Sequence, residues 1–148
     1  MLSNIQIDNA AKVLNIPRFR GTFSKDLLPT PMQPGFYVVN MQNSVSRSGR
    51  GLPGTHWVLC EVGPKSSYYV DSFGVVPPTE IISRATTPIH YSKTDIQNLE
   101  SSLCGYYCLY LMIQRSRGRG YKSIIGDFKK DTGKNSTVID KFFGIRSK

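Results

Sequence analysis

Residues 94–109 read Thr94-Asp-Ile-Gln97-Asn-Leu-Glu-Ser-Ser-Leu-Cys104-Gly105-Tyr-Tyr-Cys108-Leu. From Leu103 onward, apolar side chains repeat with helical spacing in two rows: Leu103, Tyr107 and Leu111, then Cys104, Cys108 and Met112. Ser101 or Ser102 would cap such a helix, so we expect one over about 103–115. Cys104 then lies in the first turn, where unpaired N–H groups and the helix dipole favour a thiolate.

A β-hairpin is predicted upstream of this helix. Residues 57–62 and 67–71 are β-rich runs on either side of Gly63-Pro64-Lys65-Ser66, a strong turn signal. The midpoint between His56 and Asp71 falls between Gly63 and Pro64. Because residues equidistant from a turn face each other in an antiparallel pair, the sequence predicts an imidazole and a carboxylate at the same end of the hairpin.

The remaining elements are predicted from periodicity and from turn residues. Apolar positions of residues 4–15 share one helical face, with Ser3 or Asn4 as the cap and Pro17 ending the helix. We expect strands at 36–40 and 89–91 and a last helix at about 136–143. Pro-, Gly- and Ser-rich composition predicts connections or loops at 21–35, 43–54 and 115–120.

Length and composition indicate one domain over 1–148, long enough to bury a hydrophobic core. No apolar run approaches the roughly 20 residues that span a bilayer, and the N-terminus lacks the pattern of a signal peptide. We therefore expect a protein that is not secreted and that works in a reducing compartment. Three cysteines, at 60, 104 and 108, are then expected as free thiols.

The net charge of +9 is unevenly distributed. Residues 114–148 hold ten Lys or Arg and three Asp, a balance of +7, whereas the first 113 residues hold nine basic and seven acidic groups, a balance of +2. This asymmetry suggests attraction to nucleic acid or another polyanion. The alternative is a solvated surface that keeps the chain in solution.

Four side chains together supply the groups that a cysteine hydrolase requires. Cys104 is the expected nucleophile, His56 the base, Asp71 the group that orients the imidazole, and Gln97 the side-chain donor to the oxyanion. The histidine suits both proton transfers at neutral pH, because its ordinary pKa lies near 6.5. We predict that these four residues are catalytic.

Other residues of chemical interest receive plainer interpretations. Trp57 is expected to cover the imidazole or to line the substrate cleft, although a tryptophan in a strand is more often a core residue. Gly105 is also expected to line the cleft. Cys60 and Cys108 are interpreted as core thiols, and His90 as a structural or surface residue. A zinc site is a poor match, since one Cys-x₃-Cys inside an apolar helix lacks the usual paired ligands.

These residues resemble the adenovirus maturation proteases, within the wider clan that includes the SUMO- and NEDD8-specific proteases. The matching segments, in chain order over about residues 10–115, are Gly21-Thr-Phe-Ser-Lys25, Gly54-Thr-His56-Trp57, Tyr69-Val-Asp71-Ser-Phe-Gly74, and Gln97 with Cys104-Gly105-Tyr-Tyr-Cys108. The resemblance implies an α+β fold, in which a central helix carrying the cysteine packs against a small mixed β-sheet. It also implies cleavage of viral precursor proteins after small residues during virion maturation, in the virion and in the cytoplasm or nucleus of the infected cell.

The resemblance also bears on partners and on the source. No cofactor is expected for the chemistry, and activation by DNA or a viral peptide stays open. A disulfide-linked activator is not expected, because the region near 86–87 has no cysteine. The small size suggests a virophage, a transposon-like element or another small DNA virus. We expect a monomer. Two alternatives remain: a deconjugating protease or acetyltransferase using the same thiol, and a basic nucleic-acid-binding module whose thiol is inert.

Overall fold

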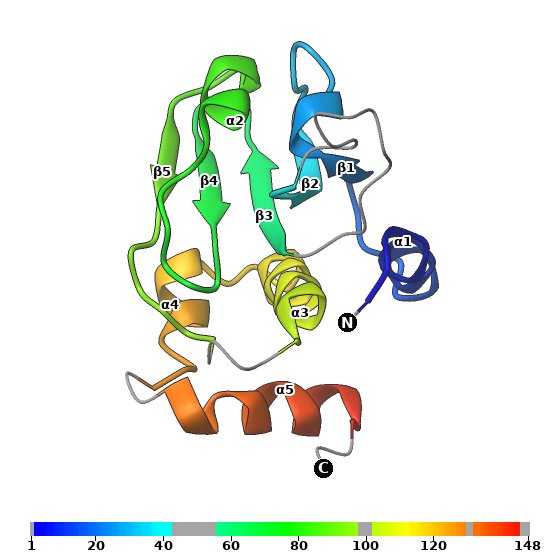
Figure 1. Ribbon diagram of the computed structural model, residues 1–148, viewed down its shortest axis with the longest axis vertical. Helices are drawn as coiled ribbons and strands as arrows, with labels where there is room; N and C mark the ends of the chain where they lie inside the picture. Colours follow the sequence, from blue (N-terminus) through cyan, green and yellow to red (C-terminus); the bar gives the residue numbers. More distant parts are fainter. Residues whose placement is uncertain (1, 43–55, 98–101, 130–131, 146–148) are drawn as a thin grey trace.

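The computed structural model describes residues 2–42, 56–97, 102–129 and 132–145 (Figure 1). The elements follow in the order α1 (Asn4–Val13), β1 (Phe19–Ser24), the 3-10 helix η1 (Lys25–Leu27), β2 (Gly35–Asn40), β3 (Trp57–Val62), β4 (Ser67–Val70), α2 (Thr79–Arg84), β5 (Ile89–Tyr91), α3 (Cys104–Ser116), α4 (Tyr121–Ile125), the 3-10 helix η2 (Thr132–Lys134) and α5 (Ser136–Phe143). None of the helices within these ranges is long and apolar enough to cross a membrane.

Five strands form one mixed sheet in the order β1-β2-β3-β4-β5. The two outer pairs are parallel and the two inner pairs antiparallel. In β3, successive side chains alternate between two buried clusters, as the period of two along a strand requires. Trp57 and Leu59 lie with α1, α3, α4 and α5, while Val58 and Cys60 lie with Ile81 of α2. The sheet is thus covered on both faces, and the predicted α+β class is confirmed.

The predicted hairpin is confirmed, with a turn centred one residue later than expected. Val62 pairs with Ser67, and the Gly63 N–H donates to the Ser66 carbonyl at 3.1 Å. The centre of the turn therefore falls between Pro64 and Lys65, and not between Gly63 and Pro64. In this register, positions 56 and 71 are not equidistant from the turn, so the predicted pairing of these two positions is wrong.

The predicted helices at both ends of the chain are confirmed. At α1, Ser3 forms a capping box: its Oγ accepts from the Gln6 N–H and its own N–H donates to the Gln6 side chain. The helix ends before Pro17, and Asn15 beyond it has a φ of 52°. The expected last helix matches α5.

Several expectations are wrong. The connection at 21–35 contains part of β1, which is held by parallel pairing with β2, and all of η1. The helices α2 and α4 were not expected, since each is only five or six residues long. The N-cap of α3 is Leu103, which makes no side-chain capping hydrogen bond, so Ser102 is not the cap. The other candidate cap, Ser101, and the loop at 43–54 lie outside the described residues.

Candidate active site

Cys104 is the first residue of α3, and its side chain is buried. The backbone N–H of Trp57 donates to its Sγ at 3.5 Å, so the first residue of β3 holds the sulfur at the helix N-terminus. Burial by itself raises the pKa of the Cys104 thiol. The hydrogen bonds from His56, from the Trp57 N–H and from the Gly105 N–H outweigh burial and lower that pKa below its ordinary value.

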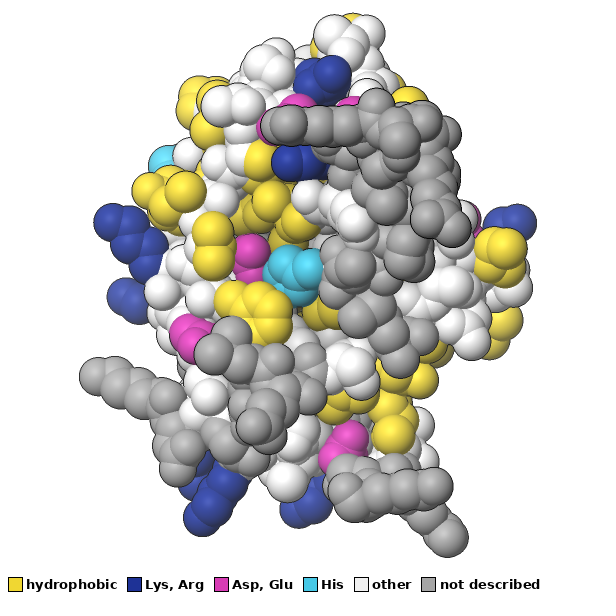
Figure 2. Space-filling view, in the orientation of Figure 1, with side chains coloured by type: hydrophobic (Ala, Val, Ile, Leu, Met, Phe, Trp, Pro, Cys, Tyr) yellow, Lys and Arg dark blue, Asp and Glu magenta, His cyan; other side chains and the backbone are white. Residues whose placement is uncertain are grey.

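His56 and Asp71 form the second part of the site. Nε2 of His56 lies 2.8 Å from Oδ1 of Asp71, which is almost fully buried. An ionised carboxylate only accepts hydrogen bonds, so this contact leaves Nδ1 as the nitrogen that exchanges a proton with the thiol. A histidine and an acidic side chain lie next to each other near the middle of the face in Figure 2, bordered by hydrophobic side chains.

The segment after β4 fixes both partners of this pair. Oδ1 of Asp71 also accepts from the backbone N–H of Phe73 at 2.8 Å, which holds the carboxylate in place. The Phe73 ring stacks on the His56 imidazole with centroids 4.7 Å apart. The sequence offered no sign of this role for Phe73, because the stacking depends on the turn that follows β4.

The surroundings of the imidazole favour its charged form. Burial alone would lower the pKa of His56, but the hydrogen bond to Asp71 and the contact with Cys104 raise it to about 9. The pKa of the Cys104 thiol is lowered at the same time, so both shifts favour a thiolate beside an imidazolium. Such a pair is chemically competent for nucleophilic attack.

Gln97 is buried next to the same segment. Its backbone N–H donates to the Ser72 carbonyl at 3.0 Å, and its Oε1 accepts from the Ser72 hydroxyl. The amide oxygen therefore accepts from Ser72, and the NH₂ group is the donor end of the side chain. Sequence reasoning singled out Gln97 but assigned no role to Ser72, 25 residues away along the chain.

Trp57 and Gly105 face the core. Trp57 is 4% exposed, and its indole N–H donates to the Leu2 carbonyl at 2.9 Å. A Cβ on Gly105 would lie 3.1 Å from Leu2 Cβ and 3.3 Å from Ile7 Cδ1, so this glycine allows α1 and the segment before it to approach α3. The aromatic ring on His56 is that of Phe73 and not that of Trp57.

The other thiols and the second histidine lie apart from this chemistry. All three cysteines are described, and all are free. Burial raises the pKa of Cys60 to about 12 and that of Cys108 well above its ordinary value. His90 is exposed on β5. Within the described ranges, no group of three or more His, Cys, Asp or Glu side chains is placed to hold a metal ion.

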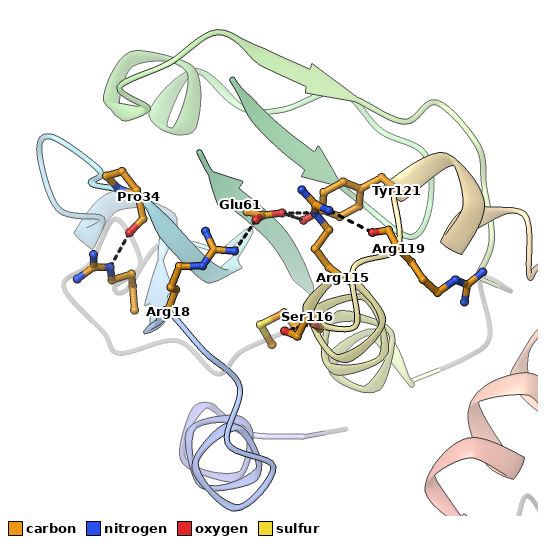
Figure 3. A network of polar contacts seen from close by, with 9 residues as sticks. Arg18, Pro34, Glu61, Arg115, Ser116, Arg119 and Tyr121 are labelled. Atoms are coloured by element: carbon orange, nitrogen blue, oxygen red, sulfur yellow. Dashed lines mark hydrogen bonds and ion pairs between the residues drawn. The ribbon is translucent and has the colours of Figure 1, made fainter. Parts of the chain in front are cut away.

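A buried carboxylate ties α3 to the sheet at the end away from Cys104 (Figure 3). Glu61 of β3 accepts from Arg115 Nε at 3.0 Å, from Arg18 Nη2 at 3.1 Å and from the Tyr121 hydroxyl at 2.6 Å. Strand β3 and helix α3 are thus joined twice, once near Cys104 and once at Glu61. These two joints fix the helix that carries the thiol relative to the strand that follows His56.

The α+β fold and a site composed of thiolate, imidazolium, carboxylate and amide have the make-up of a cysteine hydrolase. No protein-family model and no curated protein sequence matches the chain. Among solved structures, the chain is similar to the ASFV pS273R protease, at 21% identity over 72% of this chain and 40% of that chain, with a TM-score of 0.48. The Se-Met form of that protease gives 20% identity over 70% and 43% of the two chains and a TM-score of 0.47.

A third similar structure is the SUMO protease Ulp1 with its catalytic cysteine oxidized to a sulfinic acid. It shares 16% identity over 70% of this chain and 52% of that chain, with a TM-score of 0.36. The chain therefore spans about half or less of the length of these three proteins. None of the three is an adenovirus protease, so the resemblance to the adenovirus maturation proteases stays a prediction.

Proposed function

We propose that the chain is a cysteine protease in which Cys104 is the nucleophile and His56 the general acid and base. The proposal rests on the contacts that link Asp71, His56 and Cys104. Asp71 lies 2.8 Å from Nε2 of His56, while His56 and the Trp57 N–H lower the pKa of the buried Cys104 thiol. Cysteines that serve only as core residues have raised pKa values, as Cys60 and Cys108 do.

In the proposed acylation step, the Cys104 thiolate attacks the carbonyl carbon of the scissile peptide bond. As the C–N bond breaks, His56 gives its proton to the leaving amine, so an amine and a thioester remain. In the second step, His56 takes a proton from water, the resulting hydroxide attacks the thioester, and the acid product leaves. The thiolate and the imidazolium are restored.

Gln97 and the backbone N–H of Cys104 are the proposed donors to the oxyanion. The Ser72 hydroxyl donates to the amide oxygen of Gln97, so the NH₂ group is the donor end of this side chain. A donor of this kind is typically worth about 3 kcal/mol of transition-state stabilisation. The side chain is therefore proposed to act on the rate of the chemical step more than on substrate affinity.

The proposed substrates are viral precursor proteins cut after small residues, as the resemblance to adenovirus proteases implies; ubiquitin-like modifiers are the alternative. DNA and an activating peptide remain proposed partners. Two arginines of the basic segment 114–148 form ion pairs within the chain, Arg115 with Glu61 and Arg119 with Asp127. The lowered pKa of the Cys104 thiol weighs against a nucleic-acid-binding module whose thiol is inert.

The proposal is tested by alkylation with iodoacetamide at pH 7, with the labelled residue identified by mass spectrometry. We expect fast labelling at Cys104 in the wild type, slow labelling in His56→Ala, and none at that position in Cys104→Ser. Hydrolysis of peptides with a Gly-Gly site, and of a ubiquitin-like C-terminal probe, is then compared between wild type and Cys104→Ala. Equal labelling of Cys60 and Cys104, or hydrolysis retained by Cys104→Ala, would refute the proposal.

A further inference from the structure

The side chain of Asn135 is buried between the C-terminal part of the chain and the segment that carries Gln97. Asn135 is 1% exposed, and its side chain makes three hydrogen bonds, all with main-chain atoms. Nδ2 donates to the Ile96 carbonyl at 3.1 Å and to the Lys129 carbonyl at 2.7 Å. Oδ1 accepts from the Lys129 N–H at 2.7 Å. Positions 39 residues apart in the chain are thus joined through one side chain.

Asn135 makes these contacts instead of capping the helix that it precedes. It is the N-cap residue of α5, and an asparagine at this position ordinarily accepts from an N–H of the first turn. Here its φ of −69° and ψ of −27° are helical, and among the described residues its side chain makes no capping hydrogen bond. The amide therefore serves residues outside α5, which indicates a role in holding the tertiary structure.

Asn135 and Ser72 hold the two ends of one peptide group. The carbonyl of this group belongs to Ile96 and accepts from Asn135. The N–H belongs to Gln97 and donates to the Ser72 carbonyl at 3.0 Å. Because a peptide group is planar, a hydrogen bond at each end fixes both its position and its tilt. The Ile96 N–H donates to the same Ser72 carbonyl at 2.8 Å, which holds the preceding peptide group as well.

The position of this peptide group decides where the Gln97 side chain begins, because the Gln97 Cα lies in the same plane. The Ser72 hydroxyl holds the far end of that side chain, and Asn135 fixes the main chain from which it extends. Without Asn135, the buried Ile96 carbonyl would lose this donor, and a turn of the peptide group toward another donor would move the Gln97 amide. A misplacement of about 1 Å can cost on the order of 10²-fold in rate.

Apolar packing fixes Asn135 relative to the helix that carries the nucleophile. Ile139 of α5 and Phe128 belong to the same buried cluster as Ile96 and Tyr107 of α3. The rings of Phe128 and Tyr107 have centroids 5.4 Å apart. Figure 1 shows α5 below α3, and the two helices are in contact. The side chain that reaches Ile96 therefore comes from an element that is docked on α3.

We propose that Asn135 is a positioning residue for catalysis, which holds the proposed oxyanion donor Gln97 through the peptide group between residues 96 and 97. Asn135 acts only through Gln97 and has no contact with substrate in this role. Helix α5 is thereby part of the catalytic unit, beside any role of the basic charge in this part of the chain. The inference rests on the proposed protease function and adds to it a residue that governs the oxyanion donor.

The first test compares the turnover of Asn135→Asp and Tyr37→Phe on a peptide with a Gly-Gly site. Asn135→Asp keeps the size of the side chain and the acceptor for the Lys129 N–H, but it removes the donor to the Ile96 carbonyl. Tyr37→Phe is the matched control, since it removes a hydrogen bond from a buried side chain to the Gln33 carbonyl on the other face of the sheet. We expect kcat to fall about 10-fold in Asn135→Asp with KM within about two-fold of wild type, and no change in Tyr37→Phe. Equal kcat values for the two variants would overturn the proposal.

A double mutant separates positioning from stability. If Asn135 acts through Gln97, Asn135→Asp lowers kcat in the wild type but leaves the kcat of Gln97→Ala unchanged. An equal fold-loss in both backgrounds would mean a merely structural role and would overturn the proposal. Rates are divided by the fraction of Cys104 that iodoacetamide labels rapidly, so that unfolded protein does not count. Asn135→Ser, which removes the donor without adding a charge, should give the same pattern and replaces Asn135→Asp if that variant does not fold.

A second measurement does not depend on catalysis. In ¹⁵N-labelled Cys104→Ala protein, the side-chain NH₂ signals of Gln97 are assigned by their loss in Gln97→Ala. Asn135→Asp should shift these signals, and Tyr37→Phe should leave them in place. Unmoved Gln97 signals would overturn the inference alone, even where the wild type hydrolyses peptides. Shifted signals together with hydrolysis retained by Cys104→Ala would overturn the protease and leave the link between Asn135 and Gln97 intact.

Discussion

Ser72 holds Gln97 through two contacts, because its hydroxyl donates to Gln97 Oε1 and its carbonyl accepts from the Gln97 N–H at 3.0 Å. Ser72 directly follows Asp71, whose carboxylate contacts His56. One short segment after β4 therefore positions both the group that orients the imidazole and the proposed oxyanion donor. The two functions are coupled through the backbone of residues 71–73.

Ser72→Ala is expected to lower kcat by about 10-fold, less than the 10²–10³-fold typical of losing a complete oxyanion donor and expected for Gln97→Ala. The hydroxyl orients the amide without contacting substrate. The measurement is kcat for a peptide substrate, together with the rate of iodoacetamide labelling. Labelling depends on the thiolate and should stay at the wild-type rate in both variants; a parallel fall in labelling would mean that Ser72 supports the thiolate instead.

The pH dependence of acylation should report the coupled pair of Cys104 and His56. The pKa of His56 is raised to about 9, so His56 keeps the proton for the leaving amine below that pH and loses it above. The Cys104 pKa is lowered, so the thiolate persists below the ordinary range for cysteine. We expect the single-turnover rate to fall above pH 9, and also at low pH once the thiolate is protonated.

Asp71→Asn should move the labelling of Cys104 to higher pH. Without the carboxylate, the pKa of His56 falls toward its ordinary value near 6.5, and the thiolate loses its charged neighbour at pH 7. Labelling at pH 7 should slow by about 10-fold and recover toward pH 9 as the thiol ionises unaided. Superimposable labelling profiles for wild type and Asp71→Asn would show that the carboxylate does not control the pair.

The residues that sequence reasoning found are those whose pattern is local. Residues 57–62 are a β-rich run beside a turn signal, and the Ser3 cap precedes an apolar face, so β3 and α1 are predictable from the chain itself. The hairpin followed from its turn residues. The chemical types and the order of His56, Asp71, Gln97 and Cys104 were enough to select them, since few other side chains offer this chemistry.

What the sequence did not predict depends on distant partners. Strand β1 lacks a clear alternating pattern and exists through its parallel pairing with β2. Phe73 and Ser72 act through His56 and Gln97, which are remote in the chain. The pKa of about 9 for His56 comes from its contacts with Asp71 and Cys104, which outweigh the lowering by burial, and these contacts are not visible in a residue list. The burial of Trp57 in the core depends on Leu2 in the same way.

Glu61→Gln should destabilise the fold by about 2 kcal/mol, because the buried network with Arg18, Arg115 and Tyr121 loses its charge. For a chain of this length, the change corresponds to a fall in Tm of roughly 4–8 °C, measured by calorimetry or circular dichroism. Glu80→Gln is the matched control. Glu80 pairs with Lys25 at 3.4 Å near the surface, so its loss should cost about 0.5 kcal/mol or less. Equal effects of the two changes would mean that Glu61 is not a structural anchor.

Gly105→Ala separates packing from substrate contact next to the nucleophile. The new Cβ would lie 3.1 Å from Leu2 Cβ and 3.3 Å from Ile7 Cδ1, so the N-terminal segment must shift. We expect a loss of about 1–3 kcal/mol in the free energy of unfolding. Gly120→Ala is the control, since a Cβ there meets nothing within 4 Å.

A double mutant decides between the two interpretations of Gly105. If the glycine serves packing, Leu2→Gly makes room for the new methyl group because it removes the Leu2 Cβ, and the double mutant is more stable than the two single losses added together. The kcat/KM of the double mutant should recover together with its stability. If Gly105 instead contacts substrate, Gly105→Ala lowers kcat/KM with little change in Tm, and Leu2→Gly restores nothing. Because the described contacts of Gly105 are with α1 and the segment before it, we expect the first outcome.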